Sequence, residues 1–187
     1  LVVAAGVGTG GVYMATEQTR LDNEAIDIAM LMGAYYESSN KHIGKPYIDY
    51  AGKGRPWTVC NGITGSKVNP NKYYTEAECK EMEGVIYTQA LSVAKANFKY
   101  WPEYNVFVRA TFLDTIWNVP SAITGDTTLM RKANSGDLIG ACKELPRWVY
   151  GTKDGVKVRL TGLVDRRDAG SELCAEWGQD GHFSTLA

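Results

Sequence analysis

Residues 37–65 of this 187-residue chain read E-S-S-N-K-H-I-G-K-P-Y-I-D-Y-A-G-K-G-R-P-W-T-V-C-N-G-I-T-G, and the rest of the chain is organised around this segment. A helical repeat of apolar residues runs into Glu37 and stops there. A segment rich in Gly, Pro and Lys follows, with short β-like runs at 46–50 and 57–60. Because turn residues bound both runs, the sequence predicts a helix that delivers Glu37 to the edge of a small hairpin region.

Three polar side chains of this stretch could converge. They are the carboxyl of Glu37 at the helix end, the carboxyl of Asp49 in the hairpin and the hydroxyl of Thr58 on the next strand. Two carboxylates in unlike surroundings, together with a hydroxyl that positions water, are what cleavage of a glycosidic bond requires. Spacing alone does not decide this, because two acids in a loop-rich segment are commonly solvated surface charges.

The order of motifs resembles that of a known family. A helix ending in Glu, then Y-x-D, then W-T-V-C-x-G-x-T-G is similar to the phage lysozymes of glycoside hydrolase family 24. The resemblance covers almost everything after about residue 22 and is strongest for the signal-arrest-release endolysins, which carry a weak N-terminal membrane segment. The later motifs that agree are Y-T-E-A-E-C (Tyr74–Cys79), L-M-R-K-A-N-S-G-D-L-I-G-A-C (Leu129–Cys142), R-W-V-Y (Arg147–Tyr150) and G-L-V-D-R-R (Gly162–Arg167).

This resemblance implies an α+β fold, mainly α, with a small β-hairpin lobe and a helical lobe around a substrate cleft. The catalytic domain would span 19–187, with the β-rich lobe at about 38–72 and the helical lobe at about 98–180. The chain departs from the family through extra loop residues at Asn40–Lys45 and Gly52–Arg55. It also has Asn118-Val119-Pro120 where the family has N-x-G, so the geometry of the cleft stays open.

The same resemblance implies a peptidoglycan N-acetylmuramidase that lyses the host cell by cutting the β-1,4 bond between N-acetylmuramic acid and N-acetylglucosamine. Glu37 would be the general acid, Asp49 would stabilise the charged transition state or activate water, and Thr58 would orient that water. Two other functions stay open: a lytic transglycosylase, against which the presence of both Asp49 and Thr58 argues, and a wall-binding module without catalysis. We expect a monomer without cofactor or metal, acting on peptidoglycan and not on nucleic acid.

The N-terminal residues 1–14, L-V-V-A-A-G-V-G-T-G-G-V-Y-M, are apolar, uncharged and rich in Gly and Ala. They are too few for a membrane-spanning helix, which needs about 20 residues, and an ordinary flexible leader is an alternative. The chain begins without Met, so we expect residues upstream. The resemblance identifies 1–18 as the remnant of a membrane segment that first tethers the inactive enzyme at the host inner membrane and later releases it to the periplasm.

Four cysteines occur, at positions 60, 79, 142 and 174, and four allow three pairings. We favour Cys60 with Cys79, and Cys142 with Cys174. Four buried free thiols are the alternative, whereas disulfides require an oxidising space such as the periplasm. The sequence contains no C-x-x-C motif, which would suggest a zinc site. His42 and His182 are too far apart in the sequence to indicate a metal site.

Helical periodicity predicts the remaining elements. Asp22 or Asn23 is expected to cap the first helix, and a capping box at Thr75–Glu78 to open another. The run ending at Asn118 is apolar nearly all round, which is typical of a central buried helix. We expect helices at 19–36, 75–97, 103–118, 125–132, 137–150 and 165–177, a polar turn-like segment at 151–159 and a disordered tail at 182–187.

Overall fold

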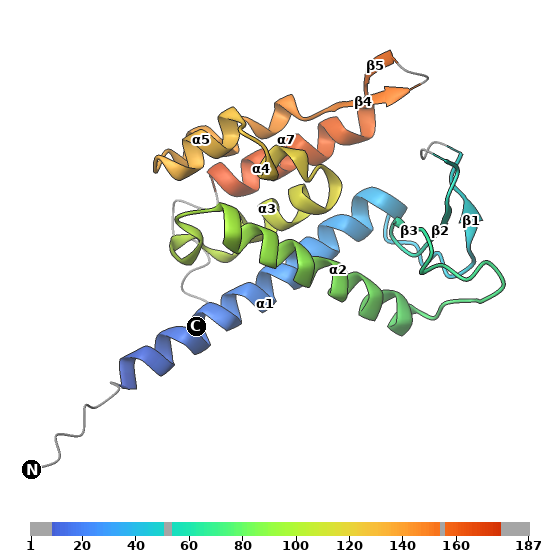
Figure 1. Ribbon diagram of the computed structural model, residues 1–187, viewed down its shortest axis with the longest axis horizontal. Coiled ribbons are helices and arrows are strands. Elements are labelled where there is room, and N and C mark those ends of the chain that lie inside the picture. The colour runs from blue at the N-terminus through green and yellow to red at the C-terminus, as the bar shows by residue number, and fades with distance from the viewer. Residues whose placement is uncertain (1–8, 51–53, 154–155, 177–187) are drawn as a thin grey trace, which may run out of the picture.

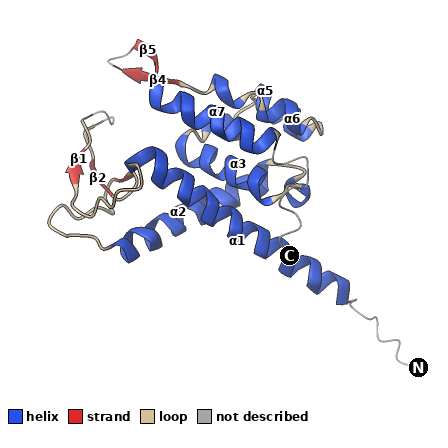
Figure 2. Ribbon diagram, turned by 180° about the vertical axis from the view of Figure 1, so that it is seen from behind, coloured by secondary structure: helices blue, strands red, loops and turns tan. Residues whose placement is uncertain are grey.

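The protein is mainly helical, with two small sheets. The structure, a computed structural model, describes residues 9–50, 54–153 and 156–176. Figure 1 shows the long helix α1 running from the N-terminal end of the molecule to the first sheet, and Figure 2 shows the strands confined to the two sheets. The elements are α1 (Thr9–Ser38), β1 (Tyr47–Ile48), β2 (Trp57–Val59), β3 (Ile63–Thr64), α2 (Glu76–Asn97), η1 (Trp101–Glu103), α3 (Val106–Asn118), α4 (Ser121–Thr124), α5 (Thr128–Asn134), α6 (Leu138–Cys142), η2 (Leu145–Arg147), β4 (Tyr150–Lys153), β5 (Val156–Arg159) and α7 (Thr161–Ala175).

The small lobe is an antiparallel sheet in the order β1-β2-β3. Thr58 on β2 lies opposite Tyr47 on β1 and Thr64 on β3. The apolar side of the lobe packs on the start of α2, where Thr75 and Glu78 form the predicted capping box. Its buried cluster is Val59, Cys60, Ile63, Val68, Tyr74 and Cys79.

The helical lobe is built around α3, as the apolar run predicted. Every residue from Val108 to Ile116 is buried, and the helix packs against α1, α2 and α7. It starts at Val106 and not at residue 103, because the side chain of Asn105 accepts hydrogen bonds from two N–H groups of its first turn. The fold class expected from the sequence, α+β and mainly α, is therefore confirmed.

The start of α1 differs from the prediction. The helix is continuous from Thr9, so it joins the glycine-rich segment to the helix of Glu37, and Asp22 does not cap it. Asp22 is instead buried, and its carboxylate binds Arg109 (2.7 Å), Lys95 (2.6 Å) and the indole N–H of Trp101 (3.0 Å). The local sequence makes Asp22 resemble a helix cap, but its carboxylate pairs with the buried guanidinium of Arg109, which is distant in the sequence.

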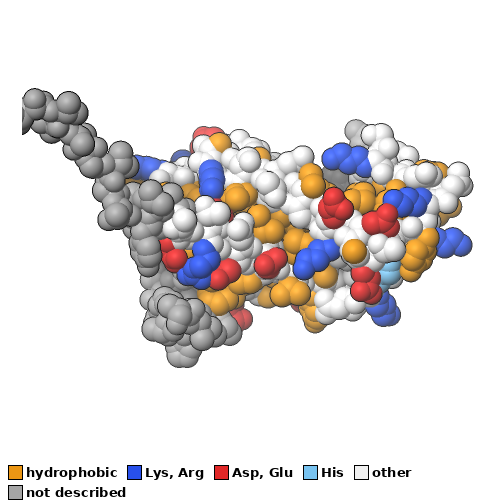
Figure 3. All heavy atoms as spheres, turned by 90° about the horizontal axis from the view of Figure 1, so that it is seen from below, with side chains coloured by type: hydrophobic (Ala, Val, Ile, Leu, Met, Phe, Trp, Pro, Cys, Tyr) orange, Lys and Arg blue, Asp and Glu red, His pale blue; other side chains and the backbone are white. Residues whose placement is uncertain are grey.

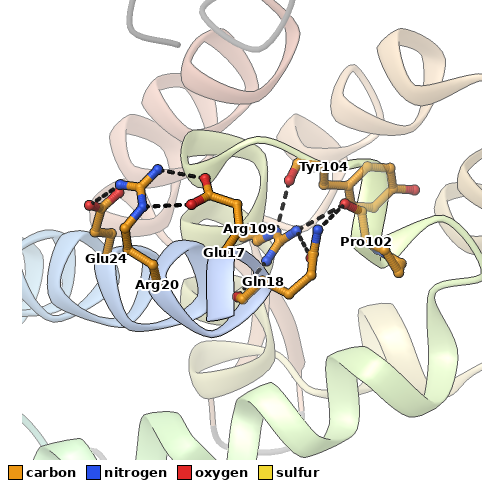
Figure 4. A network of polar contacts seen from close by, with 7 residues as sticks. All are labelled: Glu17, Gln18, Arg20, Glu24, Pro102, Tyr104 and Arg109. Atoms are coloured by element: carbon orange, nitrogen blue, oxygen red, sulfur yellow. Dashed lines mark hydrogen bonds and ion pairs between the residues drawn. The ribbon is translucent and has the colours of Figure 1, made fainter. Parts of the chain in front are cut away.

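Arg109 fastens the first half of α1 to the helical lobe. Figure 4 shows its guanidinium donating to the side chain of Gln18 and to the carbonyl oxygens of Pro102 and Tyr104. Arg109 is fully buried, and burial lowers the pKa of this guanidinium, although the nearby Asp22 opposes that shift. A buried cation needs such partners, because an unpaired charge in the interior is costly.

Gly33 in α1 has a packing role. A Cβ atom built there would lie 2.5 Å from the hydroxyl oxygen of Tyr87 on α2, closer than van der Waals contact allows. The glycine therefore leaves room for the buried side chain of Tyr87 against α1, one turn before Glu37.

The C-terminal half contains two corrections. In the segment 151–159, predicted as turn-like, residues 151–153 and 156–159 belong to the antiparallel strands β4 and β5, in which Tyr150 lies opposite Arg159. The helix predicted at 125–132 is α5, which begins only after its cap, Thr127. The helix predicted at 137–150 is divided into α6, which Asp137 caps, and the 3-10 helix η2, which contains Pro146. The predicted tail at 182–187 and His182 lie outside the described residues.

Both disulfides favoured from the sequence are present in the structure. Cys60 joins Cys79 with Cα atoms 5.5 Å apart, and Cys142 joins Cys174 with Cα atoms 5.6 Å apart, both ordinary separations. The first links the end of β2 to α2, and the second links α6 to α7.

Candidate active site

Glu37 lies in the last turn of α1, beside the first sheet. Its side chain is 30% exposed, and Oε1 accepts a hydrogen bond of 2.5 Å from Nη1 of Arg166 on α7. The helix end thus presents a carboxyl that water and substrate can reach, and the arginine restricts its orientation.

Arg166 is itself held by a second carboxylate. Its Nε and Nη2 donate to the two oxygens of Asp114 on α3, at 3.0 and 2.6 Å, and its guanidinium lies 5.7 Å from the ring centre of Tyr36. Burial alone would lower the pKa of Arg166, but the hydrogen bonds to Asp114 and Glu37 outweigh burial and raise it. Because Asp114 already compensates its charge, Arg166 can orient Glu37 without contributing an uncompensated cation.

The second oxygen of Glu37 faces the turn between β2 and β3. A Cβ atom built on Gly62 would lie 3.6 Å from Oε2 and 3.9 Å from the ring of Trp117. Since Arg166 donates a hydrogen to Oε1, a proton on this carboxyl belongs on Oε2.

Asp49 and Thr58 are placed by the sheet. The N–H of Asp49 donates to the carbonyl of Pro56 at 3.0 Å, and the hydroxyl of the buried Thr58 donates to the same carbonyl at 3.4 Å. Tyr47 lies opposite Thr58 on the neighbouring strand, and the pKa of its phenol responds to both Asp49 and Glu37. Burial raises the pKa of its phenol most, and the negative charges of Asp49 and Glu37 raise it further.

The sequence did not indicate the part that Arg166 plays in this site. Arg167 lies near Asp114 (3.6 Å) and donates to Asn118. Arg166 joins Glu37 to Asp114 in the core. The sequence does show two adjacent arginines in a predicted helix. Their acidic partners are too distant in the sequence to be identified from a local pattern. His42 is exposed, and its Nε2 lies 2.9 Å from the carbonyl oxygen of Tyr74.

Comparisons with known proteins identify relatives of this chain. A family model described as phage lysozyme matches residues 40–170, so Glu37 lies just before the matched segment. The SAR-endolysin of Enterobacteria phage P21 is 34% identical over 138 residues, covering 73% of this chain and 78% of that protein. The SAR-endolysin of Bacteriophage PS119 is 36% identical over 136 residues, covering 72% and 75%.

Solved structures share the fold. The active form of the P1 phage endolysin Lyz superposes with a TM-score of 0.66 at 20% identity, covering 87% of this chain and 92% of that one. The endolysin from Escherichia coli O157:H7 phage FAHEc1 gives a TM-score of 0.68 at 15% identity, covering 82% and 92%. At such identities the likeness concerns the fold alone. With the family match over most of its length and relatives above 30% identity, this chain belongs to the phage lysozyme family.

Proposed function

We propose that this protein is an endolysin, a muramidase that hydrolyses the β-1,4 bond between N-acetylmuramic acid and N-acetylglucosamine in peptidoglycan to lyse the host cell. The observation that carries the proposal is the placement of Glu37. Its partly exposed carboxyl is fixed by the Arg166–Asp114 pair and lies beside the sheet that bears Asp49 and Thr58. Lysozyme chemistry requires such a carboxyl near a second carboxylate.

In this mechanism Glu37 donates the proton on Oε2 to the glycosidic oxygen as the bond to the sugar carbon breaks. Asp49 stabilises the positive charge that develops on the ring, or activates the water that attacks the carbon, and Thr58 orients this water. The water supplies hydroxide to the sugar carbon, and its remaining proton restores the acid. Neither step needs a metal or a cofactor.

Steering by net charge has little part in substrate capture. The formal net charge is −1, and Figure 3 shows basic and acidic side chains interspersed over one face of the molecule. Affinity for the wall would then come from local contacts of the exposed aromatic residues of the small lobe, such as Tyr47 and Trp57.

Product analysis tests the reaction. Mass spectrometry of digested, purified peptidoglycan is expected to show fragments that end in reducing muramic acid, because water takes up the sugar carbon. Anhydro-muramic ends would mean that the enzyme is a lytic transglycosylase, in which the sugar's own hydroxyl attacks. Binding without any fragments would instead indicate a wall-binding module.

We also propose that residues 1–18 tether the monomeric enzyme at the inner membrane before its release into the periplasm. The relatives named SAR-endolysin support this, and so does the continuity of α1 from Thr9 to the turn of Glu37. None of the helices in the part of the chain that the structure describes combines the length and the apolar character that a membrane crossing requires. In the released enzyme, Gln18 would occupy the site on Arg109 that Figure 4 shows.

Fractionation tests the tether. Full-length protein expressed in a bacterial host is expected in the membrane fraction, and an uncoupler that collapses the membrane potential should move it, uncut, to the periplasm. A polypeptide shortened by signal peptidase, or one that stays in the membrane fraction after uncoupling, would contradict the proposal.

A further inference from the structure

The turn between β2 and β3, residues 60–62, forms one wall of the space around Glu37. Cys60 and Gly62 both have left-handed backbone conformations, with φ of 56° and 84°. The pair Val59–Ile63 of the sheet closes this turn, and the N–H of Cys60 donates to the carbonyl of Ile43 at 2.8 Å. Gly62 lies beside Oε2 of Glu37. The contacts of the turn with the helices around it come from the side chains of its other residues.

Two neighbouring residues of this turn are fastened to α2. Cys60 forms the disulfide with Cys79. The next residue, Asn61, donates to Oε1 of Glu83 twice, from its backbone N–H at 3.2 Å and from Nδ2 at 2.9 Å. Cys79 and Glu83 are four residues apart, so they lie on the same face of α2 and hold the turn at two adjacent points.

Asn61 is also fastened to the end of α1. Its Oδ1 accepts a hydrogen bond of 2.7 Å from the hydroxyl of Ser38, the residue directly after Glu37. The two ends of the amide therefore have different partners, a donor hydroxyl on one side and an acceptor carboxylate on the other. These partners fix the orientation of the amide group.

The carboxylate on α2 that accepts both hydrogen bonds belongs to Glu83, a buried residue. Glu83 is only 7% exposed. Burial raises the pKa of this carboxyl, and the two hydrogen bonds from Asn61 oppose that rise. A buried carboxylate that loses its donors is costly, so the contact between Glu83 and Asn61 resists being broken.

We propose that Asn61 is a positioning residue for the catalytic carboxyl, because it joins the end of α1, the turn beside Glu37 and the helix α2 in a single bridge. This inference rests on the proposed role of Glu37. Without the bridge, the turn and the last residues of α1 can move relative to each other, and Oε2 no longer has one fixed position over the bond to be cut. A displacement of about 1 Å can cost about 100-fold in rate.

The test compares Asn61→Ala with Asn134→Ala. Asn134 is a matched control because its side chain also makes two hydrogen bonds between separate segments, accepting from Lys99 N at 2.8 Å and donating to Asn97 O at 2.9 Å. Those partners lie around the C-terminal end of α2, away from Glu37 on α1. Both variants are measured for thermal stability and for release of reducing ends from soluble, uncross-linked glycan strands.

We expect kcat of Asn61→Ala to fall at least about tenfold below that of Asn134→Ala, while KM changes by less than about threefold. If Asn61 had only a structural role, both variants would lose stability, and the folded fractions of the two would have the same kcat. Equal kcat values in the two variants, or a loss confined to KM, would overturn the proposal.

Substitution of the two partners keeps the inference testable if Asn61→Ala does not fold. Glu83→Gln retains an oxygen that accepts from Asn61, whereas Glu83→Ala removes it, so kcat should be preserved better by Gln than by Ala. Ser38→Ala removes the link to α1 and should lower kcat with little change in KM. Equal kcat for the two Glu83 variants, with wild-type kcat for Ser38→Ala, would show that the bridge does not position the acid.

Failure of this inference can be told apart from failure of the proposed function. If Glu37→Gln is inactive and Asn61→Ala behaves like Asn134→Ala, the acid is assigned correctly and the bridge is not needed. If Glu37→Gln is active, the assignment of the acid itself is wrong.

Discussion

Glu37→Gln is expected to lower the rate of peptidoglycan cleavage by at least about 100-fold, because general acid catalysis contributes about 10²–10⁴-fold. The glutamine keeps the shape of the side chain, and its carbonyl oxygen can still accept the hydrogen bond from Arg166. It has no acidic proton to give to the departing sugar. The chemistry is lost while the contact with α7 remains.

The measurement is the initial rate of reducing-end release from purified peptidoglycan, with circular dichroism and a thermal melt on the same sample. Unfolded protein would also be inactive, so the melt must stay close to that of the wild type. A folded Glu37→Gln variant that clears peptidoglycan at nearly the wild-type rate would place the acid elsewhere, for example at Glu103.

The other two predicted site residues should follow in order of severity. Asp49→Asn removes the anion that faces the developing positive charge, so its defect should approach that of Glu37→Gln. Thr58→Ala should be milder if the hydroxyl only positions water, and Thr58→Ser should retain most activity because the hydroxyl remains. An Asp49→Asn variant as active as Thr58→Ser would remove the second carboxylate from the mechanism.

Local chemistry made much of the fold predictable. The capping box at Thr75 and the uniformly apolar run of α3 are determined within a few residues, so their signals are complete in the sequence. The pairing of β4 with β5 has a sequence signal as well, an Asp-Gly pair followed by alternating Val and charged residues. The mostly hydrophilic residues of the segment favour a polar turn instead, and this accounts for the wrong prediction.

Long-range partners account for what local pattern did not predict. Asp22 has the chemistry of a helix cap, but Arg109, 87 residues later, draws it into the interior. Glu37 and Arg166 are 129 residues apart, so the arginine that orients the acid could not be identified from spacing. The site was recognised through Glu37, Asp49 and Thr58, whose roles remain predictions, while its supporting contacts became visible only in three dimensions.

The carboxylate of Asp114 anchors those supporting contacts, so its removal should destabilise the whole protein. Asp114 is 1% exposed and lies between two buried guanidiniums, those of Arg166 and Arg167. Asp114→Asn keeps the size of the side chain but removes its charge, and it turns an amide N–H₂ toward groups that can only donate. Breaking a buried ion pair from one side typically costs about 3–5 kcal/mol.

We therefore expect Asp114→Asn to lower the free energy of unfolding by about 3–5 kcal/mol in urea titrations at neutral pH with both disulfides intact. Asp126→Asn is the matched control, since Asp126 forms an ion pair of similar length with Arg131 (2.7 Å) but its side chain is 85% exposed. Solvent screens such a pair, so the control should change stability by less than about 1 kcal/mol. Equal losses in the two variants would mean that Asp114 does not hold Arg166 and Arg167 in the core. The orientation of Glu37 by Arg166 would then need another explanation, because the guanidinium that contacts its Oε1 would have no fixed position of its own.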